Sequence, residues 1–197
     1  MKKTGILILA IAFISMSFSN SIKSEINTLD VDVPNSTITW KGYKPTGSHN
    51  GTIMLQSGSL EMDETKLVGG TFIVDMSSIK DEDGSAKLEK HLKSADFFEV
   101  DPFATSVFKI TEVVVNGDKE GAVIIKGEMT IKGITKEISF SANISETDNE
   151  VTLVTETFQI NRADFNVRFK SRTFFNNLKD KFVNDDFDLQ VSLVAKK

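Results

Sequence analysis

Few side chains in this sequence could do chemistry. The chain has two histidines, His49 and His91, and no cysteine. This excludes disulfides, thiolate metal sites and cysteine nucleophiles, and it leaves too few imidazoles for a histidine-rich zinc site. His49 stands between Gly47 and Gly51 and is predicted to be a loop residue whose imidazole bonds to the backbone. Ser48 precedes it, but the run does not match a nucleophile elbow, which places serine at its third position. These residues favour a protein without catalysis.

The acidic residues also predict no metal site. The segment Asp81-Glu82-Asp83-Gly84 is similar to the start of a calcium-binding loop, but the later ligands of that loop are missing. A solvated turn is the better interpretation. Asp180, Asp185 and Asp186 could pair as carboxylates, but nothing nearby supplies the apolar pocket that raises the pKa of a general acid. We therefore expect no metal ion, no cofactor and no catalytic residue.

Positive charge is concentrated in one short segment. All three arginines fall within eleven residues and Lys170 joins them, although the net charge of the chain is -5. If the segment is extended, Arg168, Lys170 and Arg172 share one face, and guanidinium groups suit phosphate or carboxylate oxygens. A charged edge strand exposed to solvent explains the same pattern. We assign six residues to the mouth of a binding site, where they would contact the polar head group of an amphiphilic ligand. They are Tyr43, His49, Arg162, Arg168, Lys170 and Arg172.

The elements that hold these residues are predicted to be almost entirely β-strands. Alternating apolar and polar residues, or runs of β-favouring residues, occupy the segments 37–43, 52–62, 67–76, 107–115, 123–131, 137–144, 151–160 and 187–195. The pairs Asn116-Gly117 and Lys132-Gly133 suit tight hairpin turns. About eight strands with mostly short connections fit an all-β fold in which an antiparallel sheet closes into a barrel and loses its exposed edges.

One helix interrupts the strands. Residues 85–98 contain helix formers, with Leu88 and Leu92 four apart and His91 between them, and Asp83 or Ser85 can cap the first turn. His91 is interpreted as a packed or solvent-facing residue. An irregular tail follows the helix and carries three phenylalanines that must pack onto the sheet or cover its open end. These candidate lid residues are Phe97, Phe98 and Phe103.

The barrel interior is predicted to be apolar and partly hollow. The chain has 15 phenylalanines but one tyrosine and one tryptophan, and phenylalanine has no polar atom to satisfy inside a dry tube. Gly127 and Ala142 are small residues among the inward positions. An eight-stranded barrel can instead be filled by its own side chains, so these residues are also explained as ordinary core. The candidate tube residues are Trp40, Phe72, Phe108, Phe140, Phe158 and Phe187.

Several segments, in order along the chain, resemble those of the YceI-like family of exported lipid-binding proteins. They are residues 40–42 (Trp-Lys-Gly), 47–51, 58–60, 74–79, 91–98 (His-Leu-Lys-Ser-Ala-Asp-Phe-Phe), 127–136 and 160–165. The resemblance implies a lipocalin-like antiparallel barrel with a helix between early strands. It also implies an elongated interior that holds a polyisoprenoid or a similar long-chain amphiphile, without catalysis. The sequence departs from the family at Asn166, where a glycine is common; asparagine tolerates left-handed backbone, so the turn is expected to survive.

The first 21 residues are predicted to be a secretory signal, because two lysines precede a short apolar run and small polar residues. Residues 22–197 then form the barrel domain, located in the periplasm or secreted, with no membrane span. The acidic balance excludes a general nucleic-acid binder. We expect binding, sequestration or transport of a lipid. The alternatives are a protein-interaction or stress-response module with a packed barrel and, more remotely, a small lipid-acting enzyme. The oligomeric state is left open, with a dimer among the options.

Overall fold

The computed structural model describes residues 25–117 and 119–197, and this part of the chain consists mainly of strands. The predicted signal segment lies outside the described residues. The strands are β1 (Ile26–Asp30), β2 (Thr37–Lys44), β3 (Gly47–Asp63), β4 (Lys66–Asp81), β5 (Thr105–Val115), β6 (Ala122–Ile131), β7 (Ile134–Glu146), β8 (Glu150–Thr155), β9 (Phe158–Asn161) and β10 (Asp186–Lys196). The helices are α1 (Ala86–Lys93) and the short 3-10 helices η1 (Val33–Asn35), η2 (Arg162–Phe165) and η3 (Lys179–Lys181).

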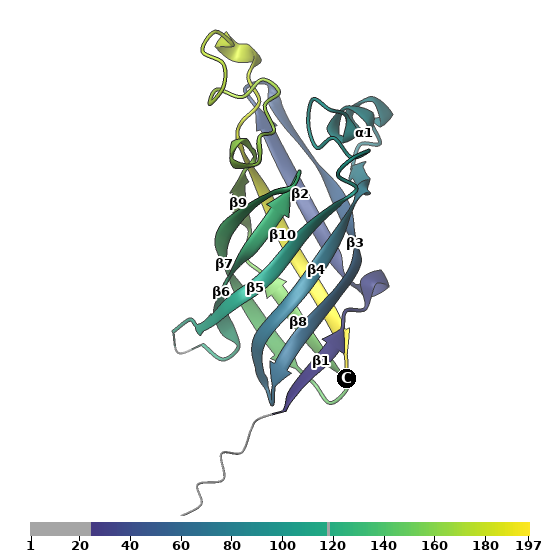
Figure 1. Cartoon of the computed structure of the whole chain (residues 1–197), viewed down its shortest axis with the longest axis vertical. Helices are drawn as coiled ribbons and strands as arrows, with labels where there is room; N and C mark the ends of the chain where they lie inside the picture. Colours follow the sequence, from purple (N-terminus) through teal and green to yellow (C-terminus); the bar gives the residue numbers. More distant parts are fainter. Residues whose placement is uncertain (1–24, 118) are drawn as a thin grey trace, which may run out of the picture.

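Eight of these strands close into an antiparallel barrel, as the sequence predicted. Their order around the barrel is β3, β2, β10, β8, β7, β6, β5 and β4, and β4 pairs with β3 to close the ring (Figure 1). The other two strands extend existing positions in the ring. β1 pairs with the far end of β3 beyond the reach of β2, and β9 pairs with the first half of β10 where β8 pairs with the second half.

The tight turn predicted at Lys132-Gly133 is confirmed. Both residues have positive φ, 50° and 71°, and they join β6 directly to β7, as a two-residue hairpin with right-handed strand twist requires. The same prediction at Asn116-Gly117 is wrong. Strand β5 ends at Val115 and β6 begins only at Ala122, so the connection is longer than the two residues that the dipeptide suggested.

The strands turn one face inward along most of their length. In β3 the residues Gly51, Ile53 and Leu55 are buried while Thr52 and Met54 between them are exposed, which is the alternation expected of a strand with one dry face. The same inward set begins at His49. The prediction of a loop at His49 is therefore wrong, because His49 lies within β3 and pairs with Gly42 of β2.

The helix α1 and its tail lie over one end of the barrel. Ser85 caps the helix as predicted, because its Oγ accepts a hydrogen bond from the backbone N–H of Leu88 at 3.3 Å. The helix ends at Lys93, where the run of helix formers ends, since Ser94 caps it by donating to the carbonyl of His91. The irregular tail predicted after the helix follows. Leu92 is the buried residue of the helix.

The segment between β9 and β10 lies at the same end of the barrel as α1 (Figure 1). The extended conformation that would place Arg168 and Arg172 on one face does not occur, because residues 166–185 form turns and η3. Asn166 adopts the expected left-handed conformation, with φ 55°, at the end of η2. Within the described residues, no helix is long and apolar enough to cross a membrane.

Candidate functional site

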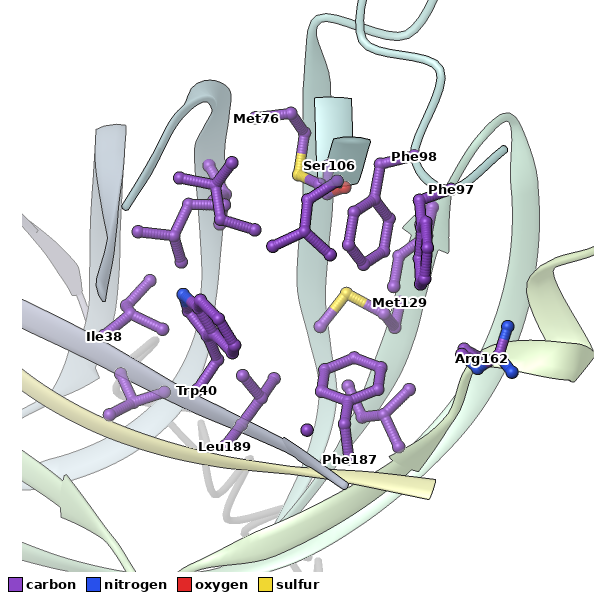
Figure 2. Close-up of a pocket in the computed structure, with 18 of the residues that line it drawn as sticks. Ile38, Trp40, Met76, Phe97, Phe98, Ser106, Met129, Arg162, Phe187 and Leu189 are labelled. Carbon is purple, nitrogen blue, oxygen red and sulfur yellow. The ribbon is translucent and has the colours of Figure 1, made fainter. Parts of the chain in front are cut away.

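A cavity of about 600 Å³ lies inside the barrel, at the end that α1 and the β9–β10 connection cover. Its wall is made of inward side chains from the barrel strands, together with residues of α1, of the segment after it and of the connection between β9 and β10. Figure 2 shows Trp40, Met129, Leu189 and Phe187 around this space, with Phe97 and Phe98 entering from the segment after α1. The barrel is therefore hollow where its covering elements meet it.

The wall of the cavity is largely aromatic. All six candidate tube residues contribute to it: Trp40, Phe72, Phe108, Phe140, Phe158 and Phe187. Four of them form a continuous row, with ring centroids 6.4 Å apart for Phe72 and Phe108, 5.3 Å for Phe108 and Phe140, and 4.3 Å for Phe140 and Phe158. These separations are typical of packed aromatic rings. The rings lie against one another along the wall and leave the space beside them open.

The few polar atoms deep in the wall already have partners. Ser106 Oγ donates to the Sδ atom of Met76 at 3.0 Å, and Thr155 Oγ1 accepts from the backbone N–H of Val191 at 2.9 Å. Trp40 turns its indole N–H to the carbonyl of Thr52 at 3.2 Å. With these groups satisfied, the deep part of the cavity offers a ligand almost only apolar surface.

Two of the three candidate lid residues reach the cavity. Phe97 and Phe98 line it, whereas Phe103 does not and lies beside the turn at Gly133. Phe97 is 7% exposed and belongs to the main core. It packs against Phe169 of the β9–β10 connection, with ring centroids 5.3 Å apart. The covering segment is thus anchored in the core by Phe97.

The candidate mouth residues separate into two groups. Tyr43, His49, Arg162 and Lys170 line the cavity. Arg168 and Arg172 are exposed and lie outside the lining; their guanidinium groups stack on the rings of Phe174 and Phe182, at 4.7 Å and 3.4 Å from the ring centroids. The alternation of exposed cations with the buried Val167 and Ser171 holds as predicted, but the backbone that carries it is a series of turns.

Arg162 is a structural arginine. It is 3% exposed and donates hydrogen bonds to the carbonyls of Val167, Val183 and Asn184 at 2.8, 2.9 and 2.9 Å. Its guanidinium also lies 3.1 Å from Asp185. Burial lowers the pKa of Arg162, and the nearby Asp185 carboxylate partly opposes this shift. The N–H groups of its guanidinium join the two ends of the β9–β10 connection. Because these N–H groups already have acceptors, few of them remain to bind a ligand.

Two cationic residues of the mouth were not identified from the sequence. Lys44 at the end of β2 and Lys87 in α1 line the cavity beside Lys170, and all three are exposed. No aspartate or glutamate lines the cavity, and none of these three lysines forms an ion pair within residues 25–117 and 119–197. An acidic protein therefore has a basic entrance to its apolar cavity.

Tyr43 connects the mouth of the cavity to strand β10. Its hydroxyl donates a hydrogen bond to Asp188, and this bond, with burial and the negative charge of Asp188 as smaller causes, raises the pKa of Tyr43 above its usual value of 10.0. The same carboxylate accepts a bond from Gln159 at 2.9 Å. Tyr43 is thus held as a neutral phenol at the rim.

The model of the YceI-like domain matches residues 29–195 of this chain. The chain belongs to the YceI-like family. A UPF0312 protein of Vibrio cholerae is 28% identical to this YceI-like protein over 146 residues, which is 72% of this chain and 74% of the relative.

Solved structures share the fold of this YceI-like chain at low sequence identity. BcnA of Burkholderia cenocepacia matches with a TM-score of 0.69 and 18% identity, over 84% of this chain and 99% of BcnA. A polyisoprenoid binding domain from Saccharophagus degradans, implicated in plant cell wall breakdown, matches with a TM-score of 0.63 and 12% identity, over 87% and 99%. At these identities the likeness concerns the fold.

Proposed function

We propose that this YceI-like protein binds a polyisoprenoid or a similar long-chain amphiphile without catalysis and thereby sequesters or carries it. The observation that supports this most is the apolar cavity of about 600 Å³ that ends at a basic entrance. Such a cavity matches an amphiphile with one oily and one anionic or polar end. The polyisoprenoid binding domain of Saccharophagus degradans, which has the same fold, gives independent support for this ligand class.

The proposed contacts follow the polarity of the cavity. The tail would lie along the aromatic row and Trp40, beneath Phe97 and Phe98. The head group would meet Lys170, Tyr43 and His49 at the rim, with Lys44 and Lys87 adding positive charge. Arg168 and Arg172 are proposed as outer contacts on the loop, and Arg162 as the group that holds this loop in place. Removal of residues 1–21 and location in the periplasm or medium complete the proposal.

Native mass spectrometry of the protein purified from its own host tests the proposal. We expect a bound lipid whose mass is lost on denaturation. Leu153→Trp should reduce the amount retained, because Leu153 is 3% exposed and lines the cavity. Val154→Trp is the matched control, since Val154 follows it in β8 but is 38% exposed and faces outward.

Three results would contradict the proposal. The first is an empty barrel with a copurified protein partner, as the interaction module requires. The second is turnover of a lipid ester that depends on His49 or His91. The third is equal lipid retention in Leu153→Trp and Val154→Trp when thermal unfolding shows that both variants are folded.

A further inference from the structure

Asp81, the last residue of β4, is a buried carboxylate with one unsatisfied oxygen. The residue is 6% exposed. Its Oδ2 atom accepts a hydrogen bond from the backbone N–H of Ser85 at 3.1 Å, but its Oδ1 atom is buried without a hydrogen-bond partner. The predicted solvated turn at residues 81–84 is therefore wrong at its first position. A buried carboxylate oxygen needs a compensating donor or cation.

The unsatisfied oxygen faces a second unsatisfied atom. His49 Nδ1 lies 3.6 Å from Asp81 Oδ1 and is also buried without a hydrogen-bond partner. This distance is too long for a hydrogen bond. A third potential ligand is close, because one ring nitrogen of His49, one carboxylate oxygen of Asp81 and one of the exposed Asp83 all lie within 4.8 Å of one another. Three potential ligand atoms thus converge on one point next to the cavity mouth.

We propose that His49, Asp81 and Asp83 bind one divalent transition-metal ion. Two ligands of a tetrahedral Zn²⁺ ion, each about 2.0–2.2 Å from it, lie roughly 3.4 Å apart, which is close to the 3.6 Å between Nδ1 and Oδ1. Asp83 is exposed, so its side chain is free to move the short distance to the ion, and water completes the shell. An imidazole ligand favours zinc, copper or nickel over calcium or magnesium.

The fold brings these ligands together through the pairing of two strands. Asp81 is opposite Gly51 in the register of β3 and β4, and the backbone N–H of Glu82 donates to the carbonyl of Asn50 at 2.9 Å. Gly51 makes the approach possible, because a Cβ atom there would lie 1.8 Å from the carbonyl oxygen of Lys80. His49 is two residues before Gly51 and points to the same side of β3.

A bound ion would connect β3 to the start of the helix that covers the mouth. Asp81 accepts a hydrogen bond from the backbone N–H of Ser85, and Ser85 caps α1. Metal binding would therefore attach the turn at residues 81–84 to β3 and reduce the motion of α1 over the cavity. This inference does not rest on the proposed lipid ligand, since the ion would bind whether the cavity is filled or empty.

The chain contains its own comparison for this site. The other histidine, His91, has a single carboxylate nearby, Asp96, with 3.0 Å between Nε2 and Oδ2. Among the described residues, no third acidic or histidine ligand joins that pair. Both histidines thus have a carboxylate beside them, but of these two places only the one at His49 also has a third potential ligand and a buried carboxylate oxygen without a hydrogen-bond partner.

Calorimetric titration of the untagged protein with Zn²⁺ alone tests the inference. We expect one ion per chain, with affinity at least about tenfold weaker in His49→Ala and in Asp83→Asn, since even loss of a residue that orients a ligand costs 10–100-fold. His91→Ala and Asp96→Asn should bind zinc as the parent does. In crystals grown with zinc, the anomalous signal should lie between His49 Nδ1 and Asp81 Oδ1.

The same measurements can overturn the inference. Absence of zinc binding would leave His49 and Asp81 as a simple ion pair, and equal loss in the His49 and His91 variants would assign binding to the surface. Asp83→Asn changes an exposed side chain, so it separates loss of a ligand from loss of folding if His49→Ala is unstable. Copurified lipid, measured in parallel, shows whether the proposed function holds independently.

Discussion

Two cations of the same segment have different environments in this protein. Arg162 is buried and its hydrogen bonds are used by backbone carbonyls, whereas Lys170 is exposed at the rim of the cavity. Residue type and position suggested that both belong to the mouth of the binding site. The difference arises because the carbonyls of Val183 and Asn184, which Arg162 holds, come from a distant part of the chain, and no local pattern reveals that partnership.

The sole tyrosine of the chain should titrate above its usual pKa. Tyr43 donates to Asp188, which favours the neutral phenol and raises its pKa above 10.0. Since the folded pKa is raised, this contribution to stability is complete below pH 10 and is lost as the pH rises through the folded value. The ultraviolet absorbance of the phenolate measures the titration directly, because no other tyrosine contributes.

The variant Asp188→Asn should return the pKa of Tyr43 towards 10.0, since it removes the charged acceptor. Asp186→Asn is the control, because Asp186 is exposed on the same strand and has no bond to Tyr43. An identical titration in the parent and Asp188→Asn would show that this hydrogen bond does not form in solution.

The exposed lysines of the mouth should select for the charge of the head group. Reversing both Lys87 and Lys170 to glutamate should weaken binding of a long-chain carboxylate about two- to thirtyfold per residue, since an exposed charge pair is worth roughly 0.2–1 kcal/mol and reversal replaces it with a repulsion of similar size. The alcohol with the same tail should bind almost unchanged. Lys109→Glu, on the exposed face of β5, is the control for net charge in each single reversal. Equal weakening of acid and alcohol would remove the mouth lysines from head-group recognition.

At the scale of elements, the strands, the helix and the tight turn at Lys132-Gly133 could be predicted, but the longer connections and the extent of the interior space could not. Period-two patterns located the barrel strands, and Ser85 located the start of α1. Apart from the turn at Asn166, no pattern marked the turns of residues 167–185, whose ends are joined by the hydrogen bonds of Arg162 to the carbonyls of Val167 and Val183. Gly127 was expected to leave room inside the barrel. Its position is instead covered by Phe108, whose ring atoms would lie 2.6 Å from an added Cβ.

Two strand glycines should therefore respond differently to alanine. Gly127→Ala should destabilise the barrel by about 1–3 kcal/mol, because the methyl group would overpack against the Phe108 ring and the carbonyl of Lys109. Gly42→Ala should be nearly neutral, since nothing lies within 4 Å of a Cβ at that position. Chemical denaturation measures both. Similar losses in the two variants would mean that backbone effects, not the Phe108 contact, determine the cost.

At the scale of the whole molecule, the size of the cavity limits how much of a ligand can be buried. If a methylene group takes up about as much space as a water molecule, roughly 30 Å³, the cavity of about 600 Å³ holds about 20 carbons. Burying them would supply about 16 kcal/mol at 0.8 kcal/mol per methylene. Association and ordering costs of about 4–15 kcal/mol offset from a quarter to nearly all of this gain. A tail longer than the cavity must leave carbons in solvent.

Affinity should therefore rise with tail length and then stop rising. For prenyl chains with the same head group, we expect an increase up to about four isoprene units, or about 20 carbons, and a plateau beyond. Trp40 is the sole tryptophan and lines the cavity, so its fluorescence reports binding without a label. Leu153→Phe, which keeps Trp40 as the single tryptophan, should move the plateau to shorter tails because it fills part of the cavity. A tenfold gain for each further unit would mean that the ligand is buried somewhere other than this barrel.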